Sequence, residues 1–351
     1  MEKQIILVNW NRFYPDKPFR LLDEFMDKLK TEPKFVFKDF DTLDKTISFF
    51  EENAHCQNMS IVLPTSPTSV GKFNSFLTES TAYCNYLQTL NNTKLTFYII
   101  PSDTFLNPAT KDWYVSIAKI DKPFVRILLS HIDNEDYLIN NIKLADMSKH
   151  HLGGISLMPS LPNPEKIIFW ERNHCNSTMY VQFNDAPINK VALSGHASDG
   201  AYRIRGQIHS WLNSHTQIYE RIPPNRNTEF FSADNIFSKK LNKYIANIYT
   251  PVYTYYNSLT LFKLYEIMAC GSLILVPECC EKVFTKMGME NNVHYKLIDT
   301  TNKTELLKTI NYVLDTNNRP EIDMIRHNGV EFCKKNLNVD KCFENFVHCF
   351  E

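Results

Sequence analysis

The chain of 351 residues is long enough for two domains, and its 43% hydrophobic and 13% aromatic content excludes a globally disordered protein. Its formal net charge of −1 argues against a nucleic-acid-binding surface and against a polybasic membrane patch. It contains no run of about 18 apolar residues, so we expect no transmembrane span. The 9 cysteines, an odd number without C-x-x-C spacing, indicate a reducing compartment, and we expect the protein in the cytoplasm.

The first half of the chain alternates short apolar runs with helical patterns. Strands are predicted at 4–9, 34–37, 59–63, 94–101, 123–129 and 167–170, with helices after Pro18 and at 42–51 and 70–90. This alternation is typical of a parallel α/β sheet with right-handed crossovers. Ligands bind such sheets at the carboxyl ends of the strands. Asp103 and His131 each follow a predicted strand, so each is a candidate catalytic base, and a turn or cap role is the alternative for both.

The second half follows a Gly- and Pro-punctuated stretch at 152–164, and we place the domain junction near residue 172. A strand at 189–194 leads into Gly195 and His196, the first strand-end loop of this half. Further strands are predicted at 272–276 and 294–299, and helices ending near 212 and at 238–246, 261–270, 281–287, 302–314, 320–335 and 339–350.

The most informative stretch is 257–278, which predicts a loop, a buried helix, a glycine and a buried strand. Gly271 stands where a helix ends in a left-handed residue. Lys263 and Glu266 are the charged residues of this helix, and their spacing puts them on one face. They form either an ordinary ion pair or a ligand-binding stripe. In the second interpretation Glu266 accepts hydrogen bonds from two ribose hydroxyls, and the helix start at 258–260 faces a diphosphate.

The order and spacing of Lys263, Glu266, Ala269, Cys270 and Gly271 resemble the donor-binding segment of GT-B glycosyltransferases of the glycosyl transferases group 1 type. The resemblance implies an α/β fold with two Rossmann-like domains facing a cleft. Residues 1–172 would form the acceptor-side domain, completed by a helix at 339–351, and 173–338 the nucleotide-sugar-binding domain. In that family the Glu binds the nucleotide ribose. Many retaining members carry a second Glu eight residues earlier, and here that position is Ser258.

The implied activity moves a sugar from a nucleotide-sugar donor to a hydroxyl of a glycan, protein or lipid. The vicinal Cys279 and Cys280 cannot comfortably chelate zinc, and no His pair has ligand spacing with them. We therefore expect a metal-independent enzyme without a cofactor beyond the nucleotide-sugar substrate. Cations and backbone N–H groups must then stabilise the diphosphate leaving group. The candidate donor-binding residues are Gly195, His196, Arg203, Arg205, Ser258, Leu259, Thr260, Lys263 and Glu266. A solvated helix start is the alternative for the two arginines, and an exposed loop position for His196.

Two alternatives to transfer remain open from the sequence. One is a catalytically silent nucleotide-sugar-binding module or partner subunit, which the serine at position 258 favours. The other is a nucleotide-sugar epimerase of the same fold. The scarcity of glycine, 9 residues, and the abundance of Asn, Lys and Ile resemble proteins of large DNA viruses or of low-GC microbes. A viral source would place the protein in the host cytoplasm.

Overall fold

The computed structural model of the protein describes residues 3–10, 23–64, 73–100, 120–129, 167–169, 175–195, 203–222, 235–251 and 262–351. The chain divides into two compact units. Unit 1 comprises Met1–His131, Glu135–Arg172 and Phe343–Glu351, and unit 2 comprises Ile132–Asn134 and Asn173–Cys342. The acceptor-side and donor roles given to the two halves of the sequence remain predictions.

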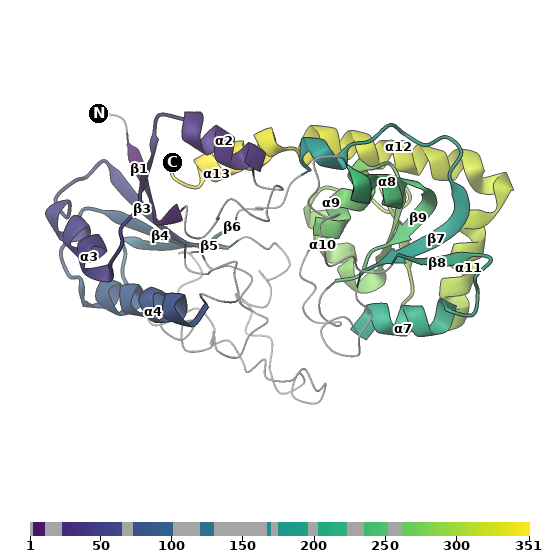
Figure 1. Ribbon diagram of the computed structural model, residues 1–351, viewed down its shortest axis with the longest axis horizontal. Helices are drawn as coiled ribbons and strands as arrows, with labels where there is room; N and C mark the ends of the chain where they lie inside the picture. The colour runs from purple at the N-terminus through teal and green to yellow at the C-terminus, as the bar shows by residue number, and fades with distance from the viewer. Residues whose placement is uncertain are drawn as a thin grey trace. The chain divides into compact units, whose positions relative to one another are not determined.

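Unit 1 contains a parallel sheet in the order β2-β1-β3-β4-β5-β6 (Figure 1). Its strands are β1 Gln4–Val8, β2 Phe35–Lys38, β3 Met59–Pro64, β4 Thr96–Ile100, β5 Val125–Leu129 and β6 Ile167–Phe169. All six coincide with apolar runs that the sequence predicts as strands. Parallel strands buried on both faces are near-continuously apolar, which is why these runs are readable without neighbours.

Helices cover both faces of this sheet (Figure 1). The helices α3 Leu43–Glu52 and α4 Phe73–Thr89 pack on one face, and α2 Asp23–Thr31 and α13 Val339–His348 on the other. Phe346 of α13 is fully buried. Its ring centre lies 5.5 Å from that of Phe25, 5.7 Å from that of Phe35 and 6.1 Å from that of Trp10. The end of the chain therefore belongs to the core of unit 1.

Unit 2 contains a second parallel sheet in the order β11-β10-β9-β7-β8. Its strands are β7 Ile188–Ser194, β8 Tyr219–Ile222, β9 Tyr244–Ile248, β10 Leu273–Pro277 and β11 Lys296–Ile298. From β7 the chain runs to β8 on one side, then returns to β9 on the other. The strand order therefore reverses between β7 and β9, and the carboxyl ends of these two strands are the expected ligand position in an open parallel sheet.

The helices of unit 2 are α7 Arg203–Leu212, α8 Ile236–Asn242, α9 Phe262–Ala269, α10 Glu281–Lys286, α11 Lys303–Leu314 and α12 Arg319–Asn336. Short 3-10 turns occupy Ser177–Met179, Glu278–Cys280 and Thr316–Asn318. The apolar faces of α7 and α11 pack into the core of the sheet, while α9 lies beside α8 and α12. The side chain of Asn302 caps α11 by accepting from the backbone N–H groups of Thr304 and Glu305, as the sequence predicts.

The predicted helix at 238–246 is wrong in its second half. Helix α8 ends at Asn242, and Tyr244–Ile248 forms β9, which pairs with both β7 and β10. The basic run Lys239 and Lys240 continues a helical pattern, but the following YIANI segment is buried between two neighbouring strands. Tertiary pairing overrides local helix propensity here. Strand β8 was not predicted from the sequence at all.

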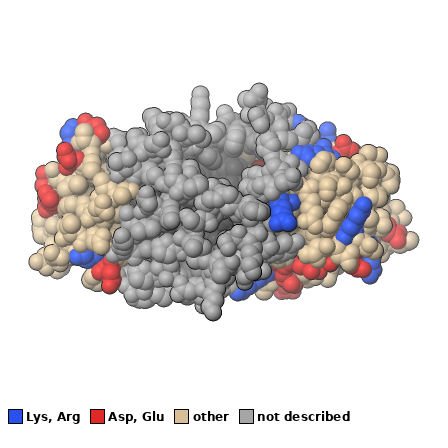
Figure 2. All heavy atoms as spheres, turned by 90° about the horizontal axis from the view of Figure 1, so that it is seen from below, with Lys and Arg blue, Asp and Glu red and all other residues tan. Residues whose placement is uncertain are grey.

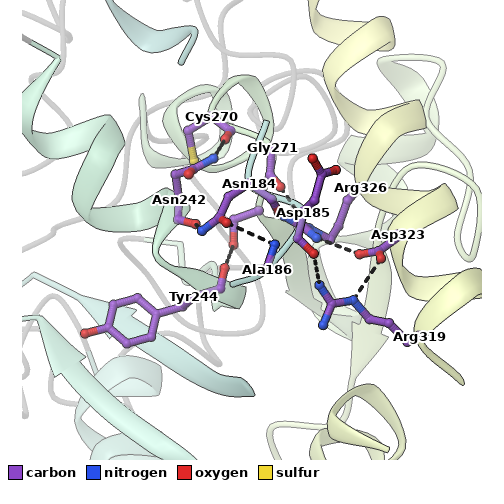
Figure 3. Close-up of polar contacts among 11 residues, drawn as sticks. Asn184, Asp185, Ala186, Asn242, Tyr244, Cys270, Gly271, Arg319, Asp323 and Arg326 are labelled. Atoms are coloured by element: carbon purple, nitrogen blue, oxygen red, sulfur yellow. Dashed lines mark hydrogen bonds and ion pairs between the residues drawn. The ribbon is translucent and has the colours of Figure 1, made fainter. Parts of the chain in front are cut away.

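Arg326 of α12 is 1% exposed and joins segments that are distant in the sequence (Figure 3). Its Nε donates to the carbonyl of Gly271 at 2.9 Å, and its Nη2 donates to the carbonyl of Asn184 at 2.8 Å. Its Nη1 lies 2.6 Å from Oδ1 of Asp323, and its guanidinium lies 4.4 Å from the ring centre of Phe183. This buried arginine is held by groups of the fold itself, so we assign it to stability.

The described surface carries charges of both signs. Figure 2 shows Lys and Arg side chains interspersed with Asp and Glu on the face seen from below. This mixture agrees with the formal net charge of −1. Among the helices within the described ranges, none is long and apolar enough to cross a membrane.

Candidate functional site

Charged side chains of unit 2 meet at the carboxyl ends of β7 and β9. Gly195 directly follows β7, and Thr250 lies two residues beyond β9. Arg205, in the first turn of α7, is only 3% exposed, and its Nε donates to Oγ1 of Thr250 at 2.8 Å. The arginine therefore bridges the two strand ends at the point where the strand order reverses, which is the usual ligand position in such a sheet.

Gly195 permits the backbone to approach this arginine. Its φ is +98°, a left-handed conformation that side-chain-bearing residues rarely adopt. A Cβ at this position would lie 2.7 Å from Nη1 of Arg205 and 3.3 Å from Cε of Lys263. The carbonyl of Gly195 accepts a hydrogen bond from Nη2 of Arg221 at 3.1 Å, which fixes the orientation of the turn.

Lys263 and Glu266 of α9 extend the same group of charges. Nζ of Lys263 lies 4.0 Å from Oε2 of Glu266, and the two side chains are 14% and 8% exposed. Nζ of Lys263 also lies 4.5 Å from the ring centre of Phe237 on α8, which favours a cation over that face. The prediction that Lys263 and Glu266 share one face of the helix is confirmed. The pair lies mostly inside the protein rather than on an open surface.

Burial governs the ionisation of this pair. It lowers the pKa of the Lys263 ammonium to about 8; the Glu266 carboxylate opposes this shift, and the Arg205 guanidinium adds to it. Burial likewise raises the pKa of the Glu266 carboxyl, and Lys263 opposes that shift. At neutral pH Lys263 is therefore mostly protonated, in surroundings where a bound anion would stabilise its charge.

The arrangement offers two kinds of recognition side by side. Arg205 and Lys263 place two cationic groups near a glycine turn, a combination that suits phosphate oxygens. Glu266, one turn of helix from Lys263, offers carboxylate oxygens that accept hydrogen bonds from neutral hydroxyls. A molecule carrying a diphosphate beside a hydroxylated ring would match both. Among the described residues, no group of His, Cys, Asp and Glu side chains has the geometry to hold a metal ion.

The structure brings together four of the predicted donor residues: Gly195, Arg205, Lys263 and Glu266. Arg203 lies at the start of α7 and is exposed, so it is not part of this buried group. The other predicted residues, Asp103, His131, His196, Ser258, Leu259 and Thr260, lie outside the described residues. Sequence reasoning missed Thr250, Arg221 and Phe237. A correct assignment of β9 as a strand would have pointed to Thr250, because that residue follows its carboxyl end.

Known proteins resemble the chain in fold but not in sequence. No protein-family profile matches it, and no curated protein matches its sequence. Among solved structures, Alr3699/HepE of Anabaena in complex with UDP and glucose is 11% identical with a TM-score of 0.53, and the match covers 99% of each chain. The same protein in complex with UDP-glucose matches with 11% identity, a TM-score of 0.53 and 99% coverage of each chain.

These likenesses show the fold. The two parallel sheets with their helices form the α/β arrangement of GT-B glycosyltransferases, as the sequence resemblance implies. At such low identity the comparison does not transfer an activity to this chain. The viral source suggested by the composition is not supported by these structures, and it remains a prediction.

Proposed function

We propose that the protein is a glycosyltransferase that uses a nucleotide-sugar donor. One observation carries the proposal: Arg205, Lys263, Glu266 and the Gly195 turn gather at the β7 and β9 strand ends, where an open parallel sheet binds ligands. Their chemistry matches the parts of a nucleotide sugar. Because these residues come from three different parts of unit 2, the end of β7, α7 and α9, the match depends on the fold and not on a local sequence pattern alone.

In this proposal the two cations hold the diphosphate. Breaking the bond between sugar and diphosphate develops negative charge on the phosphate oxygen that leaves, and cations positioned before the reaction stabilise that charge. Arg205 is anchored by Thr250 at 2.8 Å, so its guanidinium loses little freedom when it meets the phosphate. The pKa of Lys263 is lowered only to about 8, so its ammonium is mostly charged at neutral pH. In this proposal its charge fills the role that a metal ion has in metal-dependent transferases.

Glu266 would accept the ribose hydroxyls of the donor. A carboxylate that accepts two neutral hydroxyls gains charge-assisted hydrogen bonds. The burial of Glu266 supports this role. Desolvation raises the pKa of its carboxyl, and hydrogen bonds donated by ligand hydroxyls would stabilise the charged carboxylate again. UDP is the first nucleotide to test, because solved structures of the same fold are complexes with UDP and UDP-glucose.

For activation of the acceptor, the proposal relies on residues identified from the sequence alone. Asp103 and His131 are the candidates for activating the acceptor hydroxyl, and the acceptor is a glycan or another hydroxyl-bearing molecule. We propose that transfer requires neither a metal ion nor a cofactor and takes place in the cytoplasm. Residues 1–172 with 339–351 would bind the acceptor, and 173–338 the donor.

The test is an incubation of the full chain with a panel of nucleotide sugars, beginning with UDP-glucose, and detection of released nucleoside diphosphate. Turnover in the parent and its loss in Lys263→Met support the proposal. A matched control is Lys308→Met, which removes a lysine from the exposed pair with Glu305, 3.3 Å apart at the same spacing. Release of an isomerised sugar would instead establish an epimerase. Binding without any turnover would establish a silent donor-binding module, the alternative that Ser258 favours.

A further inference from the structure

A pocket lies in unit 1, at the amino ends of its strands. It has a volume of about 620 Å³, and its lining includes the residues at the start of β1, the turn before β2, the turn before β3 and the approach to β4. Because all strands of this sheet are parallel, the N-terminal ends of these four strands lie at the same end of the sheet. This end of the sheet is opposite the carboxyl ends of the strands, where α/β sheets usually bind their substrates.

The pocket is basic. Its lining includes Lys3, Lys34 and Lys94 together with His55, and none of the residues that line it is an Asp or a Glu. Nζ of Lys3 donates to the backbone carbonyl of Phe350. This neutral acceptor leaves the positive charge of the ammonium in place. Three ammonium groups around one hollow repel one another, and an anion between them converts that repulsion into attraction.

The size and the kind of cation indicate which anion fits. Ligand pockets usually measure about 300–1,000 Å³, so this one has room for a small molecule and not only for a single ion. Lysine acts on phosphate as a compact point charge with rotatable donors. A phosphoryl group carries about −1.5 to −2 charges at neutral pH, which suits several lysines better than one carboxylate does. Partial burial lowers the pKa of the Lys3 ammonium, because burial disfavours its charged form, and a bound anion would stabilise that charged form.

We propose that this pocket, lined by Lys3, Lys34, Lys94 and His55, binds the phosphate group of a small phosphorylated molecule. The site is independent of the donor site. Its residues all belong to unit 1, whereas Arg205, Lys263 and Glu266 belong to unit 2. It therefore stands whether or not the protein proves to be a glycosyltransferase.

The pocket contains its own reporter. Cys56 lines it and is half-buried, and its thiol lies 3.9 Å from Oδ1 of Asn53. A bound phosphate would block access to this sulfur. The experiment measures alkylation of Cys56 by iodoacetamide in the full chain, followed by peptide mass spectrometry. The probe is inorganic pyrophosphate, compared with sodium chloride at equal ionic strength.

We expect pyrophosphate at ten times its dissociation constant to slow the alkylation of Cys56 about tenfold, since only the free protein reacts. Lys34→Met with Lys94→Met should abolish this protection. Lys122→Met is the matched control, because Lys122 belongs to the same unit, donates to Oδ1 of Asn91 at 3.0 Å and does not line the pocket. Arg205→Ala should also keep the protection, which separates this site from the donor site.

Three results would overturn the proposal. One is an unchanged alkylation rate at millimolar pyrophosphate. Another is equal protection by sodium chloride, which would show that only screening is at work. The third is protection that survives in the Lys34→Met and Lys94→Met double variant. A thermal unfolding curve of that variant, compared with Lys122→Met, confirms that the chain tested is folded.

Discussion

Replacing Gly195 by alanine tests the geometry of the candidate site most directly. The new Cβ would lie 2.7 Å from Nη1 of Arg205, so the guanidinium must leave its place beside the turn. An alanine at φ +98° also strains the backbone by about 1–2 kcal/mol. If Arg205 binds the diphosphate, its displacement removes a hydrogen bond to a charged group, about 1.5–3 kcal/mol of binding free energy. The dissociation constant for UDP should therefore rise roughly tenfold to hundredfold.

Gly288→Ala is the matched control for this change. Gly288 has a similar φ of +82°, but a Cβ there would meet only the ring of Phe332 at 3.9 Å, an ordinary contact. Both variants should lose stability from backbone strain, about 2–4 °C for each kcal/mol in a unit of this size. Gly195→Ala should lose more than Gly288→Ala, because the displaced Arg205 also gives up its hydrogen bond to Thr250. Calorimetric titration with UDP should show weaker binding only for Gly195→Ala. Equal UDP affinity in Gly195→Ala and the parent would refute the assignment of Arg205 to the phosphates.

Three further predictions concern the same side chains. Glu266→Gln should weaken UDP binding by roughly 1.5–3 kcal/mol in a calorimetric titration. The control Glu305→Gln, in the exposed pair at equal spacing, should leave UDP binding unchanged. A fall in the stability of Glu266→Gln without a fall in its UDP affinity would show a purely structural ion pair. Arg205→Ala should weaken UDP much more than uridine, and an equal loss for both ligands would show that Arg205 does not contact phosphate. The affinity for UDP should fall as the pH rises above about 8, the pKa of Lys263, and Lys263→Met should remove this dependence.

Most strands and helices of this chain were predictable because their residues are buried in regular patterns. Strands such as β3 and β10 are short apolar runs covered on both faces, so they stand out from the polar loops around them. Helix ends were predictable where one residue type has a physical reason to be there. Gly271 adopts φ +80° at the end of α9, and Asn302 caps α11, both as expected.

The failures fall where tertiary pairing decides the structure. YIANI continues the helical pattern of α8, and only its burial between β7 and β10 makes it a strand. The order of strands cannot be obtained from local patterns, because it depends on which crossovers the chain makes. Yet this order places the ligand position between β7 and β9. Thr250 escaped prediction for that reason, while Lys263 and Glu266 were found because their spacing within one helix is a local property.

The pH prediction is useful because binding and stability respond in opposite directions. Lys263 has a folded pKa of about 8, below its ordinary value of 10.5, so between these values the unfolded chain binds more protons than the folded one. Its contribution to stability therefore rises with pH across this window. Binding of a diphosphate raises the pKa of Lys263, so above pH 8 the complex must take up a proton, and affinity falls by up to tenfold per pH unit. Weaker UDP binding at pH 9 without a lower melting temperature would identify Lys263 as a phosphate contact. Pairing with Glu266 alone would leave UDP affinity independent of the protonation of Lys263.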